Sequence, residues 1–155
     1  MSINERLFAS ASLAGPLVDG NLGHADANAF HGLLTFEAAE FAERISLVPG
    51  WSTMSVLDLI IGLVKEDSSD LAARFAVSRW TKRKAAYDDE CASWKAAAIE
   101  KGDDWRGQPM SSAQRFLIAD TARLLEIEIP EAMSRGEAAD WLDRNGAHLL
   151  YNKKG

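Results

Sequence analysis

The longest stretch of this chain without a helix-breaking residue is the feature that most constrains its fold. Residues 69–101 contain no proline and no glycine, the two residues that most often end a helix. Apolar and aromatic side chains recur along them at steps of three and four, which places them on one face of an α-helix. The stripe, which one basic residue interrupts, consists of Ala73, Val77, Trp80, Lys84, Tyr87, Cys91, Trp94 and Ala98. We predict a single helix of about 45 Å, which must protrude, bend or pack on another copy, since a compact domain of this size does not cover it.

The rest of the chain shows the same helical spacing of apolar residues. Thr35 is predicted to cap one helix, and Ser52 or Thr53 to begin the next, which is strongly apolar and expected to be the most buried. The predicted helices before the long one are 3–13, 25–34, 36–47 and 53–64. Only residues 126–129 alternate like a strand. The sequence therefore predicts an all-α fold, a helical bundle with one long central helix and a C-terminal helix-loop-helix.

A distinct C-terminal unit is predicted after a short linker that contains glycine and proline. Ser111 with Gln114, and Ser134 with Glu137, have the spacing of a capping box, in which two side chains satisfy the free amides at a helix start. The predicted domains are 1–102, a helical N-terminal domain; 103–110, a linker; and 111–155, a C-terminal helix-loop-helix subdomain.

This C-terminal pattern resembles a known family. Pro109-Met-Ser-Ser-Ala-Gln114 is followed by a Leu/Ile helix, then Ile129-Pro130, Ser134-Arg-Gly-Glu-Ala138 and Trp141-Leu142. The order is similar to a short helical module of unknown function in bacterial and phage proteins, which reads Pro-x-Ser/Thr-x-x-Gln, a leucine helix, then Ser/Thr-x-x-Glu-Ala and an apolar pair. Trp141 departs from the module, which more often has an aliphatic residue there. The resemblance implies a helical fold and an origin on mobile elements, some members lying near recombination functions, and it implies no chemistry.

The charge balance limits the classes of partner. The chain has 23 acidic and 17 basic residues, a net charge of −6, which opposes broad binding to phosphate backbones. We therefore expect no direct binding of nucleic acid. An acidic surface can instead dock on a basic groove that normally holds nucleic acid. No apolar run approaches the roughly 20 residues of a membrane span, and no secretory signal is expected at the N-terminus. The expected location is the cytoplasm.

No catalytic, metal or cofactor motif stands out. His24, Asn28 and His31 share a face if they lie on a helix, but zinc needs three or four convergent ligands, so surface histidines are the preferred interpretation. Consecutive acids at 88–90 fan out around a helix axis and are expected to be solvated. Cys91 lies on the apolar stripe and is expected to pack in the core. We expect no metal, no cofactor and no enzymatic activity.

Large aromatic residues and one arginine are the candidates for a binding surface, because tryptophan, tyrosine and arginine dominate interface energetics. The same residues on a helix stripe also form ordinary cores. Pairing of two copies about a two-fold axis through the stripe would give a homodimer. The interface candidates are Trp80, Arg83, Tyr87, Trp94, Trp105 and Trp141.

Two functional hypotheses follow. The first is a small, acidic, non-enzymatic binding protein, encoded by a phage or plasmid and similar in style to anti-CRISPR proteins, which inhibits a host defence nucleoprotein complex by protein–protein contact. The second is an accessory DNA-binding or recombination-associated protein that uses the basic residues around Trp80 and the C-terminal helix pair.

Overall fold

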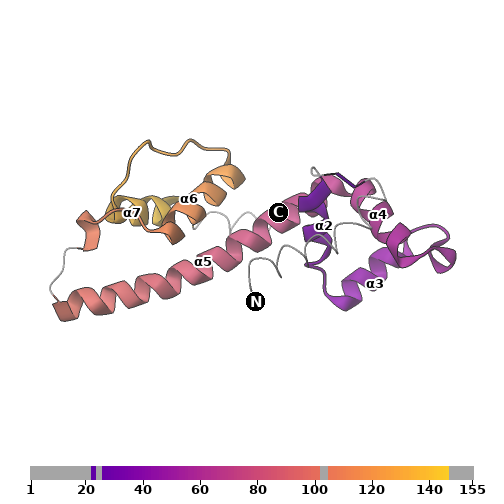
Figure 1. The fold of residues 1–155 in the computed structure, drawn as a ribbon, viewed down its shortest axis with the longest axis horizontal. Helices are drawn as coiled ribbons and strands as arrows, with labels where there is room; N and C mark the ends of the chain where they lie inside the picture. The colour runs from indigo at the N-terminus through magenta and orange to yellow at the C-terminus, as the bar shows by residue number, and fades with distance from the viewer. Residues whose placement is uncertain (1–21, 24–25, 102–104, 147–155) are drawn as a thin grey trace, which may run out of the picture. The chain divides into compact units, whose positions relative to one another are not determined.

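The computed structural model describes residues 22–23, 26–101 and 105–146, and within these ranges the fold is all-α (Figure 1). This confirms the predicted fold class. The described part contains no named strand, and its one β-bridge joins Pro109 to Ser134. The predicted helix at 3–13 lies outside the described residues. The elements are α2 (Ala27–Leu33), α3 (Ala38–Ser46), η2 (Trp51–Thr53), α4 (Val56–Glu66), α5 (Ser68–Lys101), η3 (Trp105–Gly107), α6 (Ser112–Leu125) and α7 (Arg135–Gly146).

The chain divides into two units, which we call unit 1 (Met1–Ala76) and unit 2 (Val77–Gly155). The division falls inside α5, whose first turns belong to unit 1 and whose remainder belongs to unit 2. The sequence predicts a linker at 103–110, whereas the contact-based division includes this segment in unit 2. The difference arises because α6 and α7 share their core with α5. The C-terminal helix-loop-helix subdomain, residues 111–155, stays a prediction.

Unit 1 is built where α2, α4 and the first turns of α5 meet. Its buried core consists of Leu22, Ala29, Leu33, Leu63, Val64 and Leu71. Helix α2 approaches α5 so closely at Gly32 that a Cβ atom there would lie 1.8 Å from the carbonyl oxygen of Leu71. Only a residue without a side chain fits at this crossing.

Two helix starts in unit 1 differ from the predicted ones. The N-cap of α4 is Ser55, whose Oγ accepts a hydrogen bond from the backbone N–H of Asp58 at 3.1 Å, so Ser52 and Thr53 do not begin this helix. The N-cap of α3 is Glu37, not Thr35. The hydroxyl of Thr35 instead donates to the carbonyl oxygen of Gly32 at 2.7 Å, because the chain still turns there after α2.

In unit 2, α6 and α7 lie on one side of α5 (Figure 1). The aromatic stripe of α5 forms one wall of the core that the three helices share. The buried members of this core are Trp80, Tyr87, Leu117, Ile118, Ala122, Ala138, Trp141 and Leu142. The predicted stripe is therefore an intramolecular packing face.

Both predicted capping boxes are present in unit 2. Ser111 Oγ accepts from the Gln114 backbone N–H at 3.2 Å, and Gln114 Oε1 accepts from the Ser111 N–H at 3.0 Å. Ser134 and Glu137 exchange the equivalent bonds at 3.3 and 2.8 Å at the start of α7. These bonds from Ser134 stabilise the charged form of the Glu137 carboxyl and hold its pKa below the ordinary value of 4.5.

We expect Glu137→Gln to lower the thermal midpoint at neutral pH and to have less effect in acid. A carboxyl whose pKa is lower in the folded state stabilises the fold above its unfolded pKa, and this contribution is lost as the pH falls through the folded value. Thermal melts of both proteins between about pH 7 and pH 3 measure the difference. Glu131→Gln, at an exposed position outside any helix, is the control. A wild-type advantage that stays constant down to the most acidic point would contradict the assignment.

Candidate functional site

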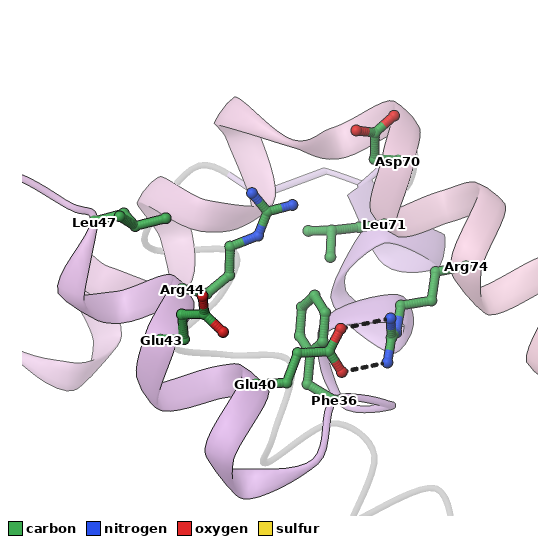
Figure 2. Close-up of a pocket in the computed structure, with 8 residues that line it drawn as sticks. All are labelled: Phe36, Glu40, Glu43, Arg44, Leu47, Asp70, Leu71 and Arg74. Atoms are coloured by element: carbon green, nitrogen blue, oxygen red, sulfur yellow. Dashed lines mark hydrogen bonds and ion pairs between the residues drawn. The ribbon is translucent and has the colours of Figure 1, made fainter.

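An open groove in unit 1 lies between α3 and the first turns of α5, with a volume of about 340 Å³ (Figure 2). We call it the α3–α5 groove. Phe36 and Leu71 lie near each other in the groove (Figure 2); Leu71 is buried, and the partly buried Phe36 packs against the same core. Its lining residues are Phe36, Glu40, Glu43, Arg44, Leu47, Asp70, Leu71 and Arg74.

Arg74 is held in place from three directions. Its guanidinium donates to both carboxylate oxygens of Glu40, at 2.9 and 2.6 Å, and through Nε to Thr35 Oγ1 at 2.9 Å. The guanidinium carbon also lies 4.2 Å from the centroid of the Phe36 ring. A paired and stacked arginine is oriented, so this side of the groove has a defined shape.

The remaining charges of the groove are mostly negative. Arg44 pairs with Asp67 at 3.4 Å, while Glu43 and Asp70 form no ion pair with any residue that the structure describes. Unit 1 as a whole contains ten acidic and four basic side chains, whereas unit 2 contains thirteen of each. The whole net charge of −6 therefore belongs to unit 1.

Exposed apolar side chains lie in the sequence that follows α3. Leu47 and Val56 are 70% and 71% exposed, and Trp51 and Met54 between them are also exposed. We call these four residues the 47–56 apolar surface. Leu47 also lines the α3–α5 groove, so the two features share a residue. These four exposed side chains, of which Leu47 lines the groove, are our candidates in unit 1 for contact with a partner.

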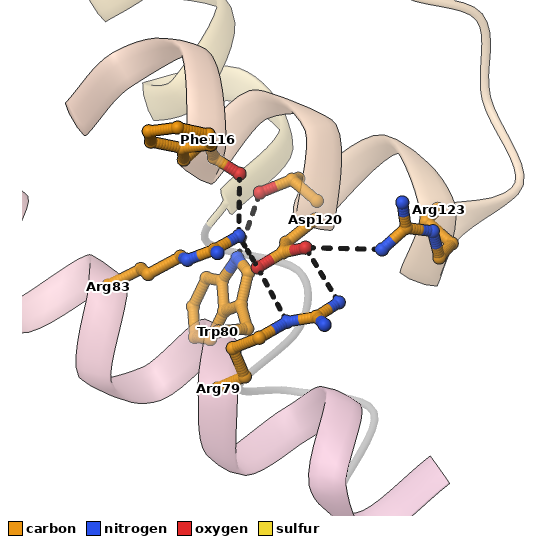
Figure 3. Close-up of polar contacts among 7 residues, drawn as sticks. Arg79, Trp80, Arg83, Phe116, Asp120 and Arg123 are labelled. Atoms are coloured by element: carbon orange, nitrogen blue, oxygen red, sulfur yellow. Dashed lines mark hydrogen bonds and ion pairs between the residues drawn. The ribbon is translucent and has the colours of Figure 1, made fainter. Parts of the chain in front are cut away.

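Unit 2 contains a cluster of three arginines around one carboxylate, the Asp120 arginine cluster (Figure 3). Asp120 on α6 is 3% exposed. Arg79 binds it through Nε at 3.1 Å and Nη2 at 2.8 Å, Arg83 binds it through Nη1, and Arg123 reaches it at 3.3 Å. Next to the cluster, Trp80 Nε1 donates to Thr121 Oγ1 at 2.8 Å. The bonds of Arg79, Trp80 and Arg83 join α5 to α6, whereas the Arg123 contact lies within α6.

The structure places the aromatic members of the predicted interface in two kinds of environment. Trp80, Tyr87 and Trp141 are buried in the core of unit 2, so they contact their own chain and are not surface anchors. Trp94 and Trp105 are partly buried, with ring centroids 6.3 Å apart.

Arg83 belongs to the Asp120 arginine cluster. The two-fold pairing predicted through the stripe does not have this face available, because α6 and α7 cover it. The homodimer itself stays a prediction.

Burial has a direct effect on Tyr87. Loss of hydration raises the pKa of its phenol well above the ordinary value of 10.0, and a hydrogen bond with Cys91 adds to this effect. Cys91 is partly buried and packs against the same core, as its place on the stripe predicted. The geometry thus gives both residues packing partners inside unit 2.

The described residues do not form the zinc site that His24 and His31 would require. His31 stacks on Phe75 with ring centroids 5.0 Å apart, and His24 lies outside the described residues. Within the described ranges, no group of three or more His, Cys, Asp or Glu side chains is placed to hold a metal ion. No helix in the same ranges is long and apolar enough to cross a membrane.

No protein-family model, curated protein or solved structure that was compared with the chain matches it.

Proposed function

We propose that this chain is a non-enzymatic binding protein whose unit 1 docks on a basic protein partner. The observation that carries the proposal is the combination, within one unit, of the 47–56 apolar surface, the acidic α3–α5 groove and the whole net charge of −6. Apolar contacts supply affinity once water is expelled, and complementary charge steers and orients the encounter.

The partner's chemistry follows from that surface. It would present aliphatic or aromatic side chains to Leu47 and Val56, flanked by Lys or Arg side chains near Glu43 and Asp70. Such charges occur in grooves that hold nucleic acid. The concrete form of the proposal is therefore a phage- or plasmid-borne inhibitor of a host defence nucleoprotein complex of the CRISPR-Cas kind, acting in the cytoplasm.

The test compares two double variants of the full chain as baits in affinity capture from cells of the encoding organism. Leu47→Gln with Val56→Gln removes two exposed aliphatic side chains from unit 1, while Ile127→Gln with Ile129→Gln makes the same change in unit 2. We expect a basic protein that is recovered with the wild type and the unit 2 control, and whose recovery falls by about tenfold or more with the unit 1 variant.

Salt provides the second half of this test. Because screening weakens attraction between exposed charges, the recovery of that protein should decrease as ionic strength rises. Equal recovery of every captured protein by the two double variants would contradict docking through unit 1, and recovery unchanged by salt would contradict the electrostatic part.

A further inference from the structure

The Asp120 arginine cluster carries more positive charge than its carboxylate neutralises. Arg79, Arg83 and Arg123 all approach Asp120, so three guanidinium groups surround one carboxylate on unit 2. Arg123 is 66% exposed and touches Asp120 through one nitrogen only, so most of its donors face solvent. Arg83 is also partly exposed.

An exposed aromatic ring lies beside the same cations. Phe116 is 56% exposed, and its ring centroid lies 5.2 Å from the guanidinium carbon of Arg83 (Figure 3). Residues 116, 120 and 123 are spaced by four and three on α6, so they share one face of that helix. The ring and the exposed arginines therefore form a single surface.

We propose that this surface is a binding site for single-stranded nucleic acid. Guanidinium groups donate paired hydrogen bonds to phosphate oxygens, and an exposed aromatic ring stacks on any base. A phosphodiester beside an unpaired base therefore offers a partner to the arginines and to the Phe116 ring. A duplex keeps its bases stacked inside and offers the ring nothing to stack on. The negative charge of the chain does not oppose binding here, because unit 2 has no net charge.

The experiment measures fluorescence anisotropy of a labelled oligothymidylate of about twelve nucleotides, a length within the usual range for one site, titrated with the full chain at low salt. We expect saturable binding that weakens as salt rises. Phe116→Ala should lower the affinity by roughly 5-fold or more, the effect of losing one base–aromatic stack. Arg123→Gln should lower it several-fold as well, and both positions are exposed enough for the fold to tolerate the change.

The matched control is Arg115→Gln, which removes the same charge from the same helix at a position about 100° around the axis from Phe116. We expect it to leave the affinity nearly unchanged. Equal losses in Arg115→Gln and Arg123→Gln would overturn the site in favour of diffuse attraction.

Two further ligands distinguish binding of a single strand from binding of other polyanions. A labelled duplex of the same length should bind more weakly than the single strand, and inorganic polyphosphate should bind without sensitivity to Phe116→Ala, because it has no base to stack. No binding of the oligothymidylate, or binding that Phe116→Ala leaves unchanged, would overturn the proposal. These variants lie in unit 2, so this result is independent of whether unit 1 docks on a protein.

Discussion

Replacing Gly32 with alanine is expected to destabilise unit 1 by about 3 kcal/mol. The new Cβ would lie 1.8 Å from the Leu71 carbonyl oxygen and 2.6 Å from its carbonyl carbon, which are backbone atoms that no side-chain rotation can move away. Helix α2 would have to shift off α5, which would open the contacts of Leu33 and Leu71 in the buried core. Urea unfolding followed by circular dichroism measures the loss.

Gly62→Ala is the matched control. Gly62 lies inside α4, and a Cβ there would meet nothing within 4 Å. Alanine favours a helix interior over glycine by about 1 kcal/mol, so this variant should be as stable as the wild type or slightly more so. Hydrogen exchange should show faster exchange in unit 1 for Gly32→Ala and unchanged exchange in the core of unit 2. Equal stability of the two alanine variants would contradict the close crossing.

Trp80→Ala is expected to destabilise unit 2 by roughly 3–5 kcal/mol. Trp80 is buried where α5 meets α6, so its truncation leaves a cavity between the two helices. It also removes the donor to Thr121 Oγ1, and that hydroxyl is completely buried.

More conservative substitutions separate the contribution of core packing from that of the Trp80–Thr121 hydrogen bond. Trp80→Phe keeps an aromatic ring but loses the hydrogen bond, and we expect a loss of about 1–3 kcal/mol because one buried partner remains unsatisfied. Adding Thr121→Val to Trp80→Phe should cost little more, since the unsatisfied hydroxyl then disappears. Strictly additive losses would show that the two side chains do not interact. A Trp80→Ala protein as stable as the wild type would place this tryptophan outside the core.

Local patterns predicted the helices of unit 2 well because their information lies within a few residues. The capping boxes at Ser111 and Ser134 depend on side chains three positions apart, and the stripe on α5 repeats at helical spacing. The same locality explains why Trp80 was an ambiguous residue. Helical spacing shows that it faces a partner surface, but it does not say whether that surface is α6 or another molecule.

The features that the sequence did not reveal depend on distant contacts. Asp120 lies on an amphipathic helix whose sequence gives no sign of Arg79 and Arg83, which lie 41 and 37 residues earlier in the chain. Thr35 has the chemistry of a helix cap, yet its hydroxyl binds Gly32 and Arg74 once α5 lies nearby. The exposure of Leu47 and Val56 could not be predicted, because their position at helix ends depends on how α3 and α4 pack.

The uneven distribution of acids and bases means that the overall charge describes neither half of the molecule. A cation near unit 1 experiences a long-range electrostatic attraction that depends on the Debye length, so ionic strength governs the association rate of a basic partner. Around unit 2, opposite charges cancel at a distance, and only a ligand already within contact range of the arginines gains from them. A change in ionic strength should therefore alter the association rate of a partner at unit 1 and the lifetime of a complex at unit 2.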